Sequence, residues 1–214
     1  MNSLADPKII ELLEKLQQEA AGDAQRWEAR KQQQQQNPPD NSTTDPLIRM
    51  GEFYLGVAPA EGRLLYMLAR SSNAQKIIEF GASYGISTLY LGAAARDNGG
   101  VLITTEVHPE KCQATRALIV EAGLEDHVSL VEGDALETLK SDEGRVDMLF
   151  LDGWKGLYLP MLELIQPRLH PGGLVAADNV DHAAANPYVE FIRGEESGYV
   201  TSTVGDMELS CYLG

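Results

Sequence analysis

Cysteine is almost absent from this chain, which has only Cys112 and Cys211 among its 214 residues. Two cysteines argue against a disulfide framework of the kind that stabilises small secreted proteins. The N-terminal stretch MNSLADPKIIELLEKL is charged and amphipathic, and it lacks the apolar core of a signal peptide. We therefore expect a cytoplasmic protein in a reducing environment.

Basic residues are also in short supply, with 17 Lys and Arg against 32 Asp and Glu and a formal net charge of −15. Non-specific nucleic-acid binding and docking on anionic membranes both depend on Lys and Arg, so this charge argues against both. No apolar run approaches the roughly 20 residues of a membrane-spanning helix. We expect a soluble protein that binds neither nucleic acid nor membrane.

What the chain does have is a regular alternation of short apolar runs with segments of helical periodicity. Its length predicts one domain, 1–214, with a helix and a polar, proline-rich loop over 1–45 and the core over 46–214. The alternation, followed by a hairpin signal at Gly205–Asp206, predicts a mostly parallel sheet with an antiparallel edge. Strands are expected near 77–80, 101–107, 128–135, 146–154 and 172–180, and helices over 8–30, 60–70, 86–91, 109–123 and 158–168.

The segment KIIEFGASYGISTLYL, residues 76–91, organises the rest of the chain. It predicts a buried strand, a turn between Gly81 and Gly85, and a helix. Glycines at such a turn allow the backbone close to a ligand, and the following helix offers free amides and the positive end of its dipole. The Gly-x-x-x-Gly spacing differs from the Gly-x-Gly-x-x-Gly of dinucleotide sites, and by itself it is a weak signal.

Acidic residues follow four of the predicted strands: Glu106, Asp134, Asp152 and Asp178, with Asn179 directly after the last. In open α/β sheets the ligand binds outside these carboxyl ends. Glu106 closes the second strand, where an acid can bind ribose hydroxyls. Clustered carboxylates require a cation, either a hard divalent metal on Asp152, Asp178 and Asn179 or a positively charged cofactor. Each residue alone also fits an ordinary turn or surface position.

From residue 76 to about 194 the chain resembles the metal-dependent O-methyltransferases that use S-adenosylmethionine. It is most similar to catechol O-methyltransferases, and caffeoyl-CoA O-methyltransferases are more distant cousins. The similar segments are VAPAEGRLL (57–65), GASYGIS (81–87), ITTEVHP (103–109), FLDGWKGLYLP (150–160) and AADNV (176–180). The resemblance implies a Rossmann-like class I methyltransferase fold with extra N-terminal helices. It also implies metal-dependent O-methylation of a small acceptor with vicinal hydroxyls, such as a catechol.

The resemblance further implies a role for individual residues. Metal binding falls to Asp152, Asp178 and Asn179, with Mg²⁺ expected first and Ca²⁺ or Mn²⁺ as alternatives. Lys155 takes the place of the catalytic lysine, which accepts or orients the proton of the metal-bound hydroxyl; a solvated surface charge is the alternative. The residues implied in S-adenosylmethionine binding are Val57, Glu79, Gly81, Ser83, Ser87, Glu106, Val107, Ala135, Asp152 and Trp154.

The chain departs from the family pattern at several positions. Gly153 stands where catechol O-methyltransferase has a histidine, and Ser83 and Ala135 replace larger or more polar residues. Ala183 lies near the place of a proline in the acceptor pocket. The late substrate-binding glutamate has no secure counterpart, although Glu195 and Glu196 are candidates. The loop at 37–46 and the segment 181–188 are expected to shape the acceptor pocket, so the substrate stays open.

Two other functions compete with this interpretation. An NAD-dependent oxidoreductase shares the fold class, but it predicts a Gly-x-Gly-x-x-Gly turn and does not need Asp152, Asp178 and Asn179 together. A non-catalytic S-adenosylmethionine-binding protein is the second alternative, which the presence of Lys155 and the metal ligands disfavours. A homodimer is expected from the family resemblance and the amphipathic N-terminal helix.

Overall fold

The computed structural model describes residues 2–36 and 50–214, so the predicted loop at 37–46 lies outside the described residues. Seven strands form one sheet in the order β3-β2-β1-β4-β5-β7-β6. The strands are β1 (Lys76–Phe80), β2 (Val101–Glu106), β3 (Val128–Glu132), β4 (Val146–Leu151), β5 (Leu169–Ala177), β6 (Tyr199–Val204) and β7 (Met207–Tyr212).

The first five strands are parallel, and β7 pairs antiparallel with both β5 and β6. The central strands β1 and β4 are almost entirely buried, and β4 accordingly has the near-continuous apolar run VDMLFL, whereas β3 at the edge of the sheet is partly exposed. The hairpin turns at Gly205, which has φ +68°. The predicted Rossmann-like sheet with an antiparallel C-terminal hairpin is confirmed.

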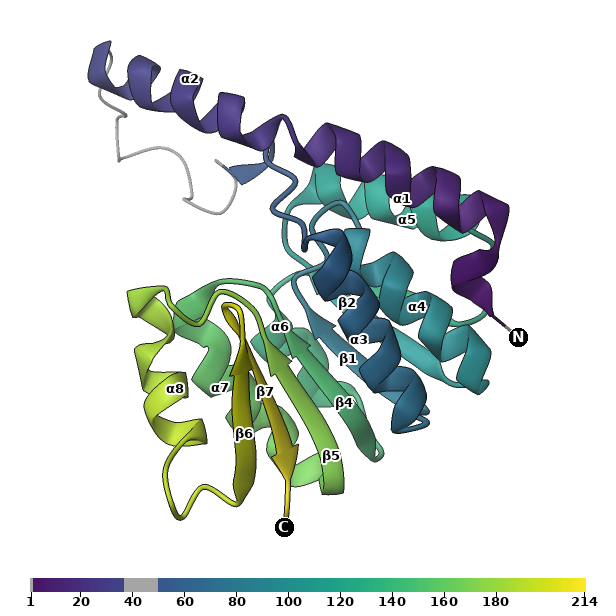
Figure 1. Cartoon of the computed structure of the whole chain (residues 1–214), viewed down its shortest axis with the longest axis vertical. Coiled ribbons are helices and arrows are strands. Elements are labelled where there is room, and N and C mark those ends of the chain that lie inside the picture. The colour runs from purple at the N-terminus through teal and green to yellow at the C-terminus, as the bar shows by residue number, and fades with distance from the viewer. Residues whose placement is uncertain (1, 37–49) are drawn as a thin grey trace.

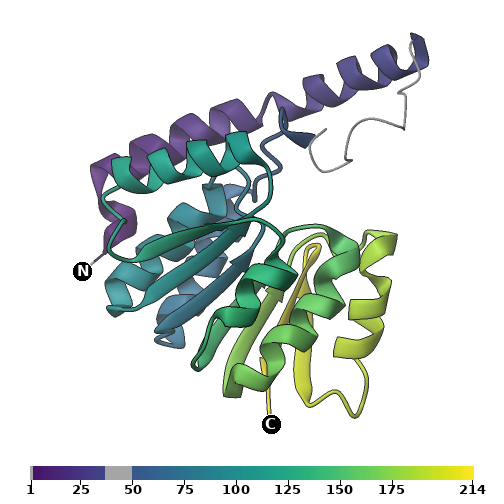
Figure 2. The same cartoon turned by 180° about the vertical axis from the view of Figure 1, so that it is seen from behind.

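Helices cover both faces of the sheet (Figures 1 and 2). The α-helices are α1 (Pro7–Ala20), α2 (Asp23–Gln36), α3 (Pro59–Ser71), α4 (Ile86–Asn98), α5 (Pro109–Glu121), α6 (Ala135–Thr138), α7 (Tyr158–Ile165) and α8 (Asn186–Ile192). Short 3-10 turns are η1 (Ser3–Ala5), η3 (Leu139–Ser141), η4 (Lys155–Leu157), η5 (Gln166–Arg168) and η6 (Ala183–Ala185).

The alternation of side chains along the strands divides the core in two. Ile77 of β1 packs with α1, α3, α4 and α5 on one face. Its neighbour Ile78 packs with α6, α7 and α8 on the other face. Both clusters are fully apolar at their centres, so the sheet is a rigid platform for the loops at its carboxyl edge.

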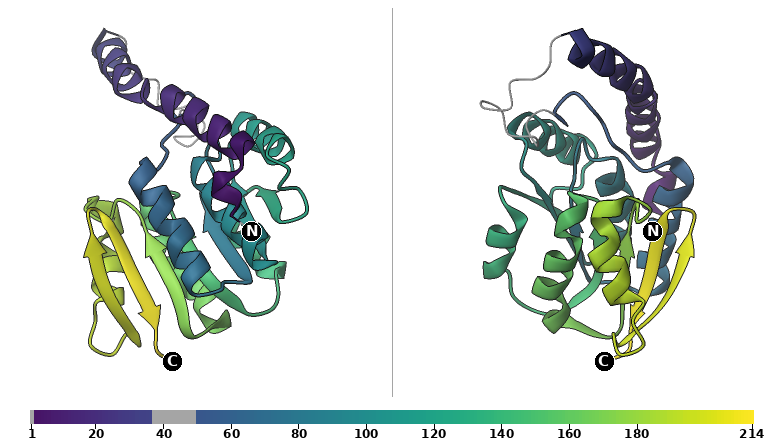
Figure 3. Two further views of the ribbon diagram at one scale, coloured as in Figure 1. Left: turned by 45° about the vertical axis from the view of Figure 1, so that its right-hand side comes forward. Right: turned by 90° about the vertical axis from the view of Figure 1, so that its left-hand side faces the viewer.

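The prediction of one helix over residues 8–30 is wrong. The structure has two helices, α1 and α2, which separate at Gly22 and form an arm that extends beyond the sheet (Figure 3). Glycine is a poor helix former, and the guanidinium of Arg26 lies only 3.1 Å from the place of a Cβ at Gly22. Asp23 then begins α2, where its charge suits the helix dipole.

Helices α6 and α8 were not predicted, because each is too short for its periodicity to be recognised. In the two described ranges, no helix combines the length and apolar character that crossing a bilayer requires.

The strand ends are locked together at the carboxyl edge. The amide of Asp152 donates to the carbonyl of Phe80 at 2.9 Å, and the amide of Asp178 donates to Leu151 at the same distance. On the other side, the amide of Ala82 donates to the carbonyl of Thr105 at 2.9 Å. The loops after β1, β2, β4 and β5 therefore begin side by side and form the candidate site.

Candidate active site

The turn after β1 has the strained backbone that its glycines allow, with φ +100° at Gly81 and +88° at Gly85. A Cβ at Gly81 would lie 2.7 Å from the amide nitrogen of Gly153, so only glycine fits there. Ser83 also has a positive φ, +46°, although it is not glycine. The hydroxyl of Thr115 donates to its carbonyl at 2.8 Å, which helps to hold this conformation.

Glu106 connects this turn to the end of β2. One carboxylate oxygen accepts from the amide of Ser83 at 2.9 Å. The other accepts from the amides of Val107 and His108, both at 2.8 Å. The carboxylate is thus fixed beside the glycine turn, where sequence analysis placed it. The side chain of Val107 is exposed next to it.

Glu79 is a fully buried acid on β1. The hydroxyl of Thr88 donates to its Oε2 at 2.6 Å, whereas Oε1 has no hydrogen-bond partner. Burial raises the pKa of Glu79, and Ser87, Thr104 and Thr88 partly oppose that rise. A buried carboxylate oxygen without a partner is costly unless a ligand supplies a donor. Glu79 therefore suits a ligand that carries an ammonium group.

The remaining predicted cofactor residues lie on the loops around this turn. Val57 is buried just before α3, and its carbonyl accepts from Gln17 Nε2 at 3.0 Å. Ser87 is buried in the first turn of α4, and Ala135 is buried at the start of α6. Trp154, after β4, is 51% exposed and offers an open aromatic surface. These positions surround the carboxyl edge of the sheet.

Lys155 contacts the acid that precedes it on the same loop. Its Nζ donates to Asp152 Oδ1 at 3.0 Å and lies 5.2 Å from the centre of the Tyr158 ring. The hydroxyl of Tyr158 donates to the carbonyl of Asp178 at 2.9 Å. Lys155, Asp152 and the loop of Asp178 are therefore brought together, as their places in the sequence predicted.

Two buried carboxylates share this region. Burial raises the pKa of Asp152 to about 6, even though Lys155 opposes the rise. Burial, reinforced by repulsion from Asp152, raises the pKa of Asp178 to about 7. Asp178 Oδ1 is buried without a hydrogen-bond partner.

Asn179 adds a neutral oxygen to these acids. It adopts φ +52°, and its Nδ2 donates to Asp206 Oδ2 at 3.3 Å, which leaves the amide oxygen available. Two carboxylates and an amide oxygen form a donor set that fits a hard divalent cation. Such a cation would offset the repulsion between Asp152 and Asp178.

The departure at Gly153 has a steric cause. A Cβ at this position would lie 2.5 Å from Cε1 of Phe80, the last residue of β1. The phenyl ring occupies the space that a side chain would need, and the residue at 153 must therefore be small.

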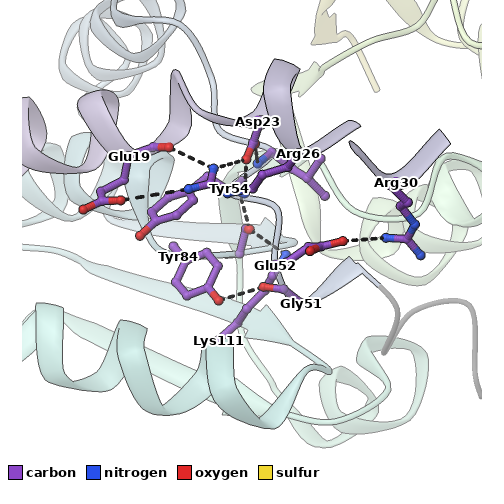
Figure 4. A network of polar contacts seen from close by, with 11 residues as sticks. Glu19, Asp23, Arg26, Arg30, Gly51, Glu52, Tyr54, Tyr84 and Lys111 are labelled. Atoms are coloured by element: carbon purple, nitrogen blue, oxygen red, sulfur yellow. Dashed lines mark hydrogen bonds and ion pairs between the residues drawn. The ribbon is translucent and has the colours of Figure 1, made fainter. Parts of the chain in front are cut away.

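Sequence analysis missed a connection between the N-terminal arm and the glycine turn (Figure 4). The side chain of Asp23 accepts from the amides of Tyr54 at 3.1 Å and Leu55 at 2.9 Å. Tyr54 stacks on Tyr84 with ring centres 4.4 Å apart. The carbonyl of Tyr54 accepts from the Ser83 hydroxyl at 2.5 Å. The arm thus holds residues 54–57 against the turn.

A buried lysine, also missed, supports the same turn. Lys111, near the start of α5, is 4% exposed, and its Nζ donates to Ser83 Oγ at 3.0 Å. Burial lowers its pKa, and the charges of Glu106, Asp23 and Asp152 oppose this effect. No sequence pattern marks Lys111, because its role depends on how α5 packs against the turn after β1.

The structure places both candidates for a substrate-binding glutamate near the C-terminus away from the site. Glu195 and Glu196 are exposed in the segment before β6, at the amino edge of the sheet and away from the site. Two other acids lie at the site, Glu61 in the first turn of α3 and Asp206 in the hairpin turn. The sequence holds one clue to Asp206. A hairpin whose second strand pairs antiparallel with the last parallel strand has its turn at the carboxyl edge of the sheet.

Comparisons with known proteins agree with this geometry. Residues 78–180 match a family model described as a methyltransferase domain. A catechol O-methyltransferase B from Danio rerio is 34% identical over 163 residues, which cover 73% of this chain and 61% of the relative. A catechol O-methyltransferase from Niastella koreensis is 32% identical over 143 residues, covering 65% of this chain and 64% of the relative. The chain thus matches less than two thirds of the length of these relatives.

Solved structures share the fold. An O-methyltransferase from Bacillus cereus in complex with SAH has a TM-score of 0.68 at 22% identity, covering 85% of this chain and 96% of that chain. The O-methyltransferase TomG from Streptomyces achromogenes, in complex with SAM, has a TM-score of 0.69 at 24% identity, covering 80% and 92%. Residues 78–180 thus match a methyltransferase domain, the chain is similar in sequence to catechol O-methyltransferases, and the solved O-methyltransferases share its fold.

Proposed function

We propose that this protein transfers the methyl group of S-adenosylmethionine to a hydroxyl of a small acceptor with vicinal hydroxyls, and that a divalent metal is required. The observation that carries the proposal is the contact of Lys155 with Asp152 beside the buried, unpartnered carboxylate of Asp178. This group adjoins the glycine turn, since Gly81 and Gly153 are in close contact. The match of residues 78–180 to a methyltransferase domain and the similarity to catechol O-methyltransferases support the same reaction.

The cofactor binds along the turn after β1. Glu79 and the backbone of residues 81–83 hold its methionine part, and the unpartnered Oε1 of Glu79 is available to the ammonium group. Val57 and Ser87 bind its amino acid end. Glu106 accepts from the ribose hydroxyls, as acids at this strand end do in related folds. Val107, Ala135 and Trp154 flank the adenine.

Asp152, Asp178 and Asn179 hold the metal, and Mg²⁺ is the first choice because their three oxygens leave positions for water and a chelating acceptor. When bound, the metal lowers the pKa of a coordinated hydroxyl. Lys155 accepts or orients the proton of that hydroxyl, and its contact with Asp152 sets its position. The loops after β4 and β5 align the acceptor oxygen with the sulfonium methyl, so that positioning of the two reacting groups supplies much of the rate.

The names of the similar proteins favour a phenolic acceptor such as a catechol. The NAD-dependent oxidoreductase is disfavoured by the family match. The cytoplasmic location and the homodimer stay predictions.

Replacement of Lys155 tests the proposal. Because general acid–base catalysis contributes on the order of 100-fold or more, we expect Lys155→Ala to lower kcat for catechol methylation by at least that factor. Binding of S-adenosylhomocysteine, measured by calorimetry, should stay within twofold of the unmodified protein. Lys140→Ala is the control, because Lys140 is exposed and forms a surface ion pair with Glu137. An unchanged rate in Lys155→Ala, with metal and cofactor bound, would remove the catalytic role of Lys155.

The non-catalytic alternative makes a different prediction. A protein that only binds S-adenosylmethionine would show saturable binding but no transfer of a labelled methyl group to any vicinal diphenol. Transfer to one such acceptor excludes it.

A further inference from the structure

Three carboxylates from three separate elements meet beside the proposed metal ligands. Glu61 comes from the first turn of α3, Asp178 follows β5, and Asp206 lies in the turn between β6 and β7. One oxygen of each lies within 4.8 Å of the others. Like charges this close repel one another unless a cation lies between them. No lysine, arginine or histidine in residues 2–36 and 50–214 forms an ion pair with any of the three.

A second observation indicates that the cluster receives a ligand. Asp178 is only 4% exposed, and its Oδ1 has no hydrogen-bond partner. A buried carboxylate oxygen of this kind is destabilising unless a donor or a metal reaches it. Glu61 and Asp206 are partly open to solvent and leave a path for an ion.

The two flanking acids are held in position. Glu61 Oε2 accepts from the amide of Ala58 at 2.6 Å, which fixes the side chain at the start of α3. The backbone carbonyl of Asp206 accepts from the amide of Val180 at 2.9 Å, and Asn179 donates to its carboxylate. An ion whose oxygen ligands lie roughly 2.0–2.6 Å away keeps any two of them no more than about 5.2 Å apart, and the three oxygens here meet that condition because they lie within 4.8 Å of one another.

We propose that Glu61 and Asp206 bind, together with Asp178, a further divalent cation at the carboxyl edge of the sheet, beside the one proposed on Asp152, Asp178 and Asn179. The inference rests on the proposed function because Asp178 is common to both ligand sets. It adds two carboxylates that sequence similarity does not indicate. The cation ties α3 and the C-terminal hairpin to the loop after β5. A hard, oxygen-binding ion is expected because every donor is a carboxylate.

Direct binding of Mn²⁺ tests the inference without any need for activity. The full chain, freed of metal and without cofactor or acceptor, is titrated while free Mn²⁺ is followed by electron paramagnetic resonance. We expect Glu61→Gln and Asp206→Asn each to raise the Kd for Mn²⁺ at least tenfold. The matched controls are Glu163→Gln on α7 and Asp126→Asn before β3, which remove exposed acids far from the cluster and should stay within twofold.

Thermal unfolding separates ligand binding from a merely structural role. In a chelator, Glu61→Gln and Asp206→Asn should melt above the unmodified protein, because each removes repulsion from the empty cluster. Their gain in Tm on addition of Mn²⁺ should be smaller than that of the unmodified protein. If both variants instead melt lower in the chelator and bind Mn²⁺ normally, the two acids are structural and the inference is overturned.

Asp152→Asn distinguishes this inference from the proposed function. Weak Mn²⁺ binding in Asp152→Asn, with normal binding in Glu61→Gln and Asp206→Asn, overturns the inference and leaves the proposed function intact. Normal Mn²⁺ binding in Asp152→Asn, with weak binding in Glu61→Gln and Asp206→Asn, supports the inference and contradicts the assignment of Asp152 as a ligand. Absence of saturable Mn²⁺ binding to the unmodified chain overturns the inference.

Discussion

At the scale of single residues, the space available at position 153 restricts which side chains fit there. The phenyl ring of Phe80 fills the place of any side chain there, since a Cβ would lie 2.5 Å from the ring. Gly156, three residues further along, has no atom closer than 3.9 Å to the same place. The two glycines are therefore a matched pair that differ in their surroundings.

We expect Gly153→Ala to lower the free energy of unfolding by about 2 kcal/mol, because the methyl group forces Phe80 or the loop to move. Gly156→Ala should change it by no more than about 0.5 kcal/mol. Urea unfolding of both variants measures the difference. Equal stability of the two variants would show that Phe80 does not restrict position 153.

Whether a site residue could be predicted from the sequence depends on where it lies in its strand or helix. Glu106, Asp152 and Asp178 follow apolar strands directly, and a parallel sheet places such strand ends at one edge. Glu61 and Lys111 lie within helices, so their arrival at the site depends on helix packing that a single sequence does not reveal. Glu195 and Glu196 were wrong candidates because the direction of β6 places the segment before it at the opposite edge.

At the scale of secondary-structure elements, the C-terminal hairpin is held to α8 by a buried acid. The carboxylate of Glu208 on β7 accepts from Arg193 at 3.0 and 2.6 Å and from Thr203 at 2.6 Å. Burial alone raises the pKa of Glu208, but hydrogen bonds from Arg193, Thr201 and Thr203 outweigh it and lower this pKa to about 2. The Arg193–Glu208 ion pair stabilises the fold while the carboxylate is charged.

We expect Arg193→Met to cost about 2 kcal/mol of unfolding free energy at pH 7, a value reduced because the arginine is partly exposed. A lowered folded-state pKa means that this stabilisation is complete above the ordinary value of 4.5 and is lost as the pH falls toward about 2. The difference between variant and unmodified protein should therefore shrink over this interval in denaturant titrations. Arg116→Met, which breaks the exposed pair with Glu132, is the control. A difference that does not depend on pH would contradict the argument.

The arm of α1 and α2 acts on the site through Asp23. Asp23→Ala removes the acceptor for the amides of Tyr54 and Leu55, which should exchange their hydrogens roughly tenfold faster as a result. Hydrogen exchange followed by mass spectrometry or NMR measures this effect. Glu28→Ala is the control, since Glu28 forms an exposed ion pair with Lys31 on α2. Unchanged exchange at both amides would mean that Asp23 does not hold this segment.

The elements themselves were largely predictable from sequence. Each of the five parallel strands contains a short apolar run, and Gly205 marks the hairpin. The helix over 8–30 was wrong at Gly22, where the cost of one glycine combines with the contacts that Asp23 makes to Tyr54 and Leu55. Those contacts join residues far apart in the sequence, and no local pattern encodes them.

At the scale of the whole molecule, an acidic chain with a net charge of −15 concentrates several carboxylates at one edge of its sheet. That concentration is costly without cations, and it is the physical reason to expect a metal to control activity. The similarity to catechol O-methyltransferases leaves metal dependence and acceptor undetermined. The arrangement of Asp152, Lys155, Asp178 and Asn179 is the basis on which we propose both.

The most direct measurement is transfer of a labelled methyl group from S-adenosylmethionine to catechol, first in a chelator and then after addition of Mg²⁺. We predict transfer with Mg²⁺, a loss of at least 100-fold in the chelator, and recovery when Mg²⁺ is restored in excess. Transfer that continues unchanged in the chelator would contradict the role of the metal. Cofactor binding without transfer to catechol or any other vicinal diphenol would contradict the proposed acceptor class.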